Sequence, residues 1–151
     1  MSELSVDQQI ETFLATCKTA SLATVDAQGQ PCAANIQYAH DSTWRLYWVS
    51  SAASAHSVNL GAKPQAAVTI YAHQDQPENI HGLQLRGDAA ELNDDKRSAA
   101  LSLYQAKYPF VAEPPFDSLI DQQGLYGFTP NWVRWIDNRK GFGWKVEKTL
   151  G

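Results

Sequence analysis

Residues 45–71 read RLYWVSSAASAHSVNLGAKPQAAVTIY, and this stretch decides the fold class. An aromatic and β-branched run at 44–49 predicts a strand, and the apolar run at 66–72 predicts another. Between them, residues 50–64 begin with small hydroxyl side chains, carry one helical turn and end at the helix-stopping residues Gly61 and Pro64. The stretch therefore predicts a strand, a polar loop with a helical turn, and a second strand.

Short strands and breaker-rich turns continue on both sides of this stretch. Before it, apolar runs at 20–25 and 32–39 are separated by the turn sequence DAQGQP at 26–31, which predicts a hairpin. After it, the sequence predicts strands at 83–92, 125–129 and 132–136, the last two lying on either side of Pro130. Gly87 inside the strand at 83–92 indicates a bulge or a close approach of two backbones.

Two helices frame the predicted strands. Ser5 and Gln8 form a capping-box pattern, followed by apolar residues on one helical face. Asn93 is a helix N-cap, and that second helix ends before Pro109. Residues 110–123 contain two prolines and little periodicity, so we expect a long loop that covers a cleft as a lid. The resulting fold class is mainly β, an antiparallel barrel with flanking helices, although the strand spacing fits a sandwich equally well.

Length and composition indicate a single domain over residues 1–151, with no repeat or linker. Hydrophobic residues make up 44% and charged residues 19%, which excludes a disordered tail or a coiled coil. The net charge is −4 and no dense Lys/Arg run occurs, so nucleic acid is not an expected partner. No membrane-length apolar run and no export signal are present, so we expect a cytoplasmic protein.

Motifs for metal, nucleotide or nucleophilic chemistry are lacking. Cys17 and Cys32 make neither a disulfide framework nor a zinc site, and we expect both thiols to be reduced. The four histidines show no ligand spacing, so no metal site is expected; they are His40, His56, His73 and His81. No GxSxG elbow or dinucleotide fingerprint is present.

The order of these pieces resembles the FMN-binding split barrels related to pyridoxamine phosphate oxidase. Four segments carry the resemblance, over nearly the whole chain: SLATVDAQGQPCAANIQY (21–38), the opening stretch (45–71), LQLRGDAAEL (83–92) and LYGFTPNWVRWIDNRKGFGWK (125–145). The closing IDNRKGFGWK looks like that of a small, poorly characterised bacterial branch. The resemblance implies a homodimer with one FMN in each of two interface clefts.

By this resemblance, the cofactor phosphate would lie at the loop over residues 50–56. The implied contacts come from Ser50, Ser51, Ser54 and His56, with His56 standing where the family often has Lys or Arg. Hydroxyls, backbone N–H groups and a helix start suit a phosphate, whereas the alternative is an ordinary serine-rich helix cap. Arg86 and Lys63 are candidate helper cations because a neutral imidazole carries no charge.

Three further residues are candidate contacts of the flavin ring. Asn35 and Gln37 share one face of a strand, where their amides could hydrogen-bond an isoalloxazine edge or simply face solvent. Trp144 lies between Gly141 and Gly143 and could stack on a planar cofactor or pack on the barrel. The other tryptophans fall in predicted strands, which indicates a core or dimer-interface role; they are Trp44, Trp48, Trp132 and Trp135.

The resemblance thus implies an FMN-dependent oxidoreductase that transfers two electrons to or from a reduced nicotinamide or a small organic molecule. No side chain stands out as a catalytic acid or base. Two alternatives remain open at this point. One is a haem-binding or haem-degrading barrel with His56 or His81 as iron ligand, and the other is a non-catalytic dimer that has lost its cofactor.

Overall fold

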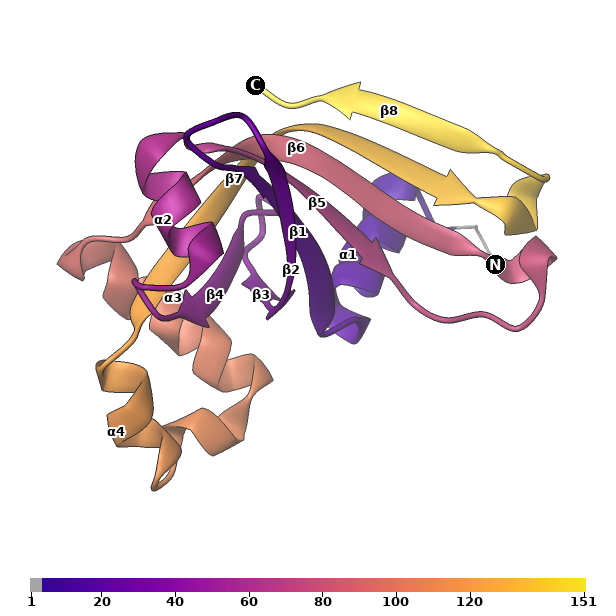
Figure 1. Cartoon of the computed structure of the whole chain (residues 1–151). Coiled ribbons are helices and arrows are strands. Elements are labelled where there is room, and N and C mark those ends of the chain that lie inside the picture. Colours follow the sequence, from indigo (N-terminus) through magenta and orange to yellow (C-terminus); the bar gives the residue numbers. More distant parts are fainter. Residues whose placement is uncertain (1–3) are drawn as a thin grey trace.

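The computed structural model describes residues 4–151, so the first three residues of the expected N-terminal segment lie outside it. Figure 1 shows a strongly curved sheet with helices around it. Its strands are β1 (Thr19–Val25), β2 (Pro31–Gln37), β3 (Ala39–His40), β4 (Leu46–Ser50), β5 (Gln65–Tyr71), β6 (His81–Glu91), β7 (Gly124–Asp137) and β8 (Lys145–Thr149). The helices are α1 (Val6–Thr16), α2 (Ala55–Ala62), α3 (Asp94–Lys107) and α4 (Phe116–Asp121), with short 3₁₀ turns η1 (Pro77–Asn79), η2 (Pro109–Ala112) and η3 (Asn138–Lys140).

The two end strands of the sheet are consecutive in the sequence, which brings the ends of the sheet together. Its strand order is β2-β1-β5-β6-β7-β4-β3, every pairing is antiparallel, and β8 pairs with the second half of β7. The two outer strands of this order, β2 and β3, are separated in sequence by Tyr38 alone. The sheet must therefore curl round until its ends meet, which makes it a barrel and not a sandwich. The predicted fold class, antiparallel and mainly β with flanking helices, is confirmed.

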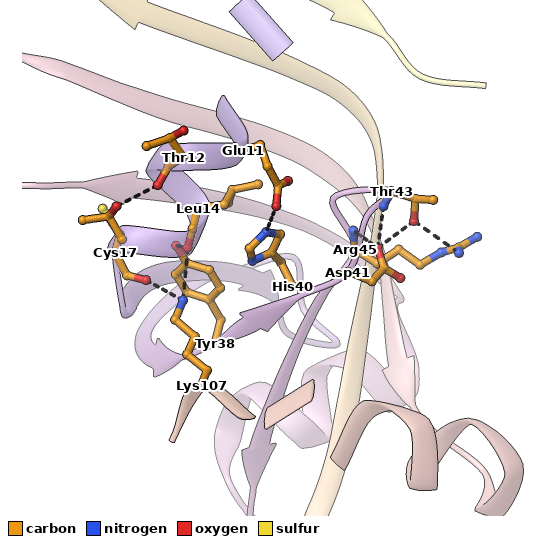
Figure 2. Close-up of polar contacts among 11 residues, drawn as sticks. Glu11, Thr12, Leu14, Cys17, Tyr38, His40, Asp41, Thr43, Arg45 and Lys107 are labelled. Carbon is orange, nitrogen blue, oxygen red and sulfur yellow. Dashed lines mark hydrogen bonds and ion pairs between the residues drawn. The ribbon is translucent and has the colours of Figure 1, made fainter. Parts of the chain in front are cut away.

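Tyr38 fastens this corner to two helices. Its side chain is fully buried, and its hydroxyl donates to the carbonyl of Leu14 at 2.8 Å. The Tyr108 hydroxyl donates to the Tyr38 carbonyl at 2.6 Å. The Lys107 ammonium lies 4.0 Å from the centre of the Tyr38 ring and donates to the carbonyls of Leu14 (3.1 Å) and Cys17 (2.5 Å), as Figure 2 shows. Burial lowers the pKa of Lys107 to about 8. The Lys107 ammonium of α3 thus binds carbonyl groups at the C-terminal end of α1, where the helix dipole favours a cation.

The core fills the barrel, and α1 packs against it. The predicted capping box is present, since the Ser5 hydroxyl accepts from the Gln8 N–H at 3.1 Å and the Gln8 side chain accepts from the Ser5 N–H at 2.8 Å. Helix α1 then buries its apolar face against the strands. The largest fully buried side chains are Trp48, Trp135, Tyr38, Phe128, Ile10, Leu14, Leu22, Leu46, Ile70, Leu83, Leu85 and Leu125. Trp48 and Trp135 are therefore core residues.

The bulge predicted at Gly87 is confirmed, but the two strands predicted around Pro130 are one strand. The register of β6 against β7 shifts between Arg86, opposite Trp132, and Gly87, opposite Pro130. A Cβ at Gly87 would lie 2.0 Å from the Thr129 carbonyl oxygen, so only glycine fits this approach. Because the ladder is already broken at the bulge, a proline without an N–H is accommodated inside β7.

The strand predicted at 44–49 begins two residues later, at Leu46. Trp44 has a φ of 65° and lies in a turn, so its prediction as a strand residue was wrong. The Asp41 carboxylate holds this turn by accepting from the N–H groups of Thr43 (2.9 Å) and Arg45 (3.1 Å) and from the Tyr47 hydroxyl (2.8 Å). Part of this turn is drawn in Figure 2. A side-chain-stabilised turn of this kind admits the left-handed conformation.

Two C-terminal elements also differ from the sequence prediction. Residues 110–123, expected as a loop, contain most of η2 and all of α4, which Figure 1 shows projecting from the sheet. The segment after β7, expected as an aromatic tail, contains strand β8. Strand β8 is mostly exposed and lacks apolar alternation, so its pairing with β7 was not visible in the sequence. Within residues 4–151, none of the helices has the length and apolar character needed to cross a membrane.

Candidate functional site

The loop singled out in the sequence connects the end of β4 to α2. Strand β4 ends at Ser50, and α2 begins at Ala55, running two turns where the sequence predicted one. The loop is shaped by Ser51, whose carbonyl accepts from the Ser54 N–H at 3.1 Å and whose hydroxyl accepts from the Ala53 N–H at 3.2 Å. The Asn59 side chain donates to the Thr24 hydroxyl at 3.0 Å in the interior and so anchors α2 on β1.

Four polar side chains converge where the loop enters the helix. The His56 Nε2 lies 2.8 Å from the Ser50 hydroxyl and 3.3 Å from the Ser54 hydroxyl. The Ser54 hydroxyl also lies 2.7 Å from that of Ser57. Ser54 is the N-cap of α2 but makes no side-chain hydrogen bond to the N–H groups of the first turn. We call Ser50, Ser54, His56 and Ser57 the serine–histidine cluster.

The cluster lies in a part of the chain with almost no charge. Residues 50–62 contain no Asp, Glu, Lys or Arg, and neither do β1, β2 and β4. Burial lowers the pKa of His56, so the imidazole is neutral at pH 7 when nothing is bound. Hydroxyl and N–H donors at the positive end of a helix, with no carboxylate beside them in this segment, suit an anion. His56 is the one side chain of the segment that could become cationic.

The two candidate helper cations lie elsewhere in the chain. Lys63 is the C-cap of α2, at the opposite end of that helix from the cluster. The Arg86 guanidinium lies 4.1 Å from the centre of the Trp132 ring, in the second half of β7. Ser50 of the cluster pairs with Gly124, at the beginning of β7. Within one chain, neither side chain joins the cluster.

The candidate ring contacts fall into two groups. Asn35 and Gln37 share the exposed outer face of β2, and the Asn35 side-chain oxygen accepts from the Ser21 hydroxyl at 3.2 Å. Trp144 lies at the opposite end of β7 from the cluster, where its carbonyl accepts from the Asp137 N–H at 2.9 Å and its ring packs against the core. The Lys140 ammonium lies 4.4 Å from the centre of the Trp144 ring. One chain alone does not bring Trp144 to the cluster.

Residues 137–144, which we call the closing loop, use their polar groups to hold the fold together. The Asp137 side chain is 1% exposed and accepts from the Arg139 guanidinium at 2.8 and 3.0 Å. Burial favours the neutral acid, but the bonds from Arg139 outweigh it and lower the pKa of Asp137. The Asn138 side chain accepts from the Gly143 N–H and donates to the Pro77 carbonyl, both at 2.9 Å. The polar residues of the DNRKGFGW sequence thus have a structural role in this loop.

Residues 4–151 line hollows that the sequence did not predict. One, of about 700 Å³, lies between α3 and the strands β4, β6 and β7 and is lined in part by Tyr47, Lys96 and Leu103. Its sequence signal is the small residues on both walls, which are Ala89, Ala90, Ala99, Ala100 and Gly127. Another, of about 310 Å³, is lined by residues that include Phe13, His81 and Trp135.

The ring of His81 has a defined orientation beside the smaller hollow. Its Nδ1 lies 2.8 Å from the Asn79 carbonyl oxygen, which fixes Nδ1 as the protonated nitrogen and leaves Nε2 able to accept. The ring makes edge contacts with Phe13 and Trp135, at centroid distances of 5.3 and 5.9 Å. A histidine held in this way resembles a typical metal-ligating histidine, whose second nitrogen donates to a carbonyl.

Comparison with known proteins agrees with the resemblance seen in the sequence. The family model described as pyridoxamine 5′-phosphate oxidase matches residues 6–136. The chain therefore belongs to the pyridoxamine 5′-phosphate oxidase family. UPF0306 protein plu4501 of Photorhabdus laumondii is 24% identical over 140 residues, covering 92% of each chain.

Solved structures of similar proteins confirm the split-barrel fold. A haem-binding protein from Mycobacterium smegmatis superposes with a TM-score of 0.80 and 22% identity, covering 99% of this chain and 60% of its own. The haem storage protein HutZ from Vibrio cholerae gives 0.70 and 20%, covering 84% and 91%. General Stress Protein 26 from Bacillus anthracis gives 0.70 and 16%, covering 97% and 100%. This chain therefore spans less than two thirds of the mycobacterial protein's length.

Proposed function

We propose that this chain binds FMN, with the cofactor phosphate at the serine–histidine cluster. The observation that carries the proposal is the convergence of Ser50, Ser54 and His56 at the start of α2, in a segment without carboxylates. Phosphate oxygens accept hydrogen bonds from hydroxyl groups and from the first N–H groups of a helix, and the helix dipole favours negative charge there. Ser51 belongs to the proposed site through the backbone of the loop that it shapes.

The flavin ring would extend from the cluster along the outside of the barrel. Asn35 and Gln37 offer side-chain amides on the exposed face of β2, and amides can match both the donors and the acceptors of an isoalloxazine edge. Trp144 joins the proposed site only if a second copy of the chain places it there, because within one chain it lies at the other end of β7.

A homodimer is part of the proposal, and the outer face of β2, β1 and β5 supports it. These three adjacent strands contain no charged residue. Their exposed side chains are mostly small or uncharged, and Tyr71 is 56% exposed. Depletion of charge and the presence of tyrosine are features of protein interfaces. Light scattering of the purified protein at micromolar concentration is expected to give twice the chain mass of 16.7 kDa.

The proposed reaction is two-electron transfer, with a reduced nicotinamide or a small organic molecule as the partner of the flavin. When bound, FMN supplies the redox chemistry itself. The residues of this chain would hold the phosphate, orient the ring by hydrogen bonds and, with a second copy, exclude water from the ring. No side chain of the cluster is needed as an acid or base for this role.

Flavin binding is tested by titrating FMN into the purified protein and following flavin fluorescence. We expect quenching on binding, and we expect Ser54→Ala and His56→Ala each to weaken binding about tenfold, as for loss of a hydrogen bond to a charged group. His73→Gln is the matched control, since His73 is exposed and contacts Asp75. Absence of FMN binding, or unchanged affinity in both cluster variants, would contradict the proposal.

Haem is the second candidate ligand, and His81 is the observation that favours it. The orientation of His81 beside the 310 Å³ hollow would suit a ligand of haem iron, and two of the structural relatives are named for haem. His56 is the weaker ligand candidate because its Nε2 already contacts two serine hydroxyls. We expect any haem absorption band formed on titration to be lost in His81→Ala and kept in His56→Ala. Binding of neither group would leave a non-catalytic barrel.

A further inference from the structure

We infer that binding of a phosphate group at the serine–histidine cluster is coupled to protonation of His56, so that the affinity for FMN rises as the pH falls. This inference rests on the proposed function and concerns the regulation of the same site. It starts from a departure of this sequence from its family, the histidine at position 56 in place of a permanent cation.

The loop and helix around the cluster contain no other ionisable side chain. Between Ser50 and Ala62, His56 is the single titratable residue. Its Nε2 contacts only the hydroxyls of Ser50 and Ser54 among the hydrogen bonds of residues 4–151. Hydroxyl groups can accept from an imidazolium as well as donate to an imidazole, so the cluster accommodates both charge states.

The elements that pack round α2 contribute little charge. Strand β1 has no ionisable side chain, β2 has only the Cys32 thiol, and β4 has only Tyr47, whose hydroxyl donates to Asp41. In the β1–β2 turn, the Asp26 carboxylate is engaged with the N–H groups of Gln28 and Gln30.

The remaining charged groups near α2 belong to other elements. They are Lys63 at its far end, and Arg86, Asp88 and Glu91 on β6, which also contacts α2. Burial is the dominant influence on His56, and it lowers the pKa of the imidazole without a contribution from a charged neighbour. A phosphate placed here would therefore be the first charge close to His56, and His56 its nearest source of positive charge.

The direction of the effect follows from linkage. A phosphate dianion beside the imidazole favours its charged form and raises the pKa of His56 above the value in the free protein. Protonation and phosphate binding then strengthen each other by the same factor. Affinity is therefore greatest below the pKa of the free protein and is lost as the pH rises through the pKa of the complex. Each unit of difference between the two pKa values is about tenfold in affinity.

The test compares FMN with riboflavin, which lacks the phosphate, between pH 6.5 and 8.5. Over this range the phosphate itself is mainly a dianion, because its second pKa is about 6. For FMN we expect affinity to fall about tenfold or more from pH 6.5 to 8.5, with net proton uptake on binding measured by calorimetry in two buffers. We expect the affinity for riboflavin to change little over the same range.

Variants separate the cluster from the rest of the protein. His56→Lys supplies a permanent cation, so we expect tight FMN binding with little pH dependence between pH 6.5 and 8.5. His56→Gln keeps a donor without a titrating group, so binding should be weak and flat across the range. His73→Gln is the control that should keep the full pH dependence of the parent protein.

The outcomes distinguish this inference from the proposed function. If FMN binds with equal affinity at pH 6.5 and 8.5 and no proton is taken up, the flavin site stands and the coupling is overturned. If the pH dependence persists in His56→Gln, another group is responsible and the coupling to His56 is overturned. If FMN fails to bind at any pH, the proposed function falls and the inference falls with it.

Discussion

The serine–histidine cluster and the closing loop are both short, polar and distinctive in sequence, yet they use their polar groups differently. In the cluster, as far as residues 4–151 are concerned, the side chains of Ser50 and His56 bond only to other cluster side chains, whereas the Ser54 hydroxyl also lies 2.8 Å from the Ser51 carbonyl, to which it can donate. In the closing loop, the Asp137 carboxylate accepts from the guanidinium and the N–H of Arg139, and the Asn138 side chain bonds to the Gly143 N–H and the Pro77 carbonyl.

This difference separates a structural motif from a candidate binding motif. Polar side chains committed to the backbone stabilise the fold and leave few donors for a ligand. The Ser50 hydroxyl and the His56 imidazole bond only to other side chains, so they can exchange those partners for a ligand at little cost to the backbone. Four predictions break or sharpen this comparison.

The largest effect on stability is expected at Gly87. This residue approaches β7 closely at a point between the serine–histidine cluster and the closing loop. In Gly87→Ala, the added Cβ would meet the Thr129 carbonyl at 2.0 Å, so the bulge cannot form as it stands. We expect a loss of about 3 kcal/mol or more in the free energy of unfolding, measured with urea. Gly61→Ala is the matched control: a Cβ there meets nothing within 4 Å, and its helical position predicts a gain of up to about 1 kcal/mol. Equal stability of the two variants would contradict the bulge geometry.

The sequence predicted the elements that depend on local chemistry. The capping box of Ser5 and Gln8, the cap at Asn93 and the bulge at Gly87 were visible because each is specified by residues a few positions apart. The continuous β7 through Pro130, the short strand β8 and helix α4 were missed, because neighbouring elements stabilise them and not their own periodicity. The location of the candidate loop could be predicted, but the bonding of Ser50 to His56 could not, since it needs the β4–α2 geometry.

The second prediction affects the closing loop alone. Arg139→Ala leaves the Asp137 carboxylate buried without its guanidinium, and we expect a loss of about 2 kcal/mol in unfolding free energy at pH 7. The pKa of Asp137 in the folded state is lowered below 3.8. The stabilisation by the Asp137–Arg139 pair is therefore fully present above pH 3.8 and is lost as the pH falls through the pKa of the folded state. Lys140→Ala, which removes the neighbouring cation from the Trp144 ring, is expected to cost about 0.5–1 kcal/mol. We expect the FMN affinity of Arg139→Ala to be unchanged. A large loss of FMN affinity in this variant would contradict the assignment of a purely structural role to the closing loop.

The third prediction concerns the ring contacts proposed on β2. Asn35→Ala and Gln37→Ala each remove an exposed amide, and we expect the FMN affinity to fall about three- to tenfold and the flavin reduction potential to shift. Gln65→Ala removes an exposed glutamine from β5 and serves as the control. Should both β2 variants bind FMN as the parent does, with an unchanged potential, these residues would lie outside the site.

The smallest effect is expected for the cluster in the absence of ligand. His56→Ala removes bonds made only between side chains, so we expect an unfolding free energy within about 0.5 kcal/mol of the parent protein. Ser54→Ala also removes the bond to the Ser51 carbonyl, so we expect a loss of about 1 kcal/mol. Thermal unfolding without FMN measures this. A loss near that of Arg139→Ala would mean that the cluster is a structural motif after all.

Because Tyr38 alone connects β2 and β3, proteolytic cleavage at this position would have a consequence for aggregation. Both strands end the sheet order, so each has one bare row of backbone N–H and C=O groups. As long as the chain is intact at this corner, Tyr38 keeps the two strands next to each other, and its hydrogen bonds with Leu14 and Tyr108 anchor the corner. Cleavage of the chain beside Tyr38 would let β2 and β3 move apart, so that their unpaired backbone edges become accessible to the strands of other molecules, the geometry from which strand-to-strand aggregation starts.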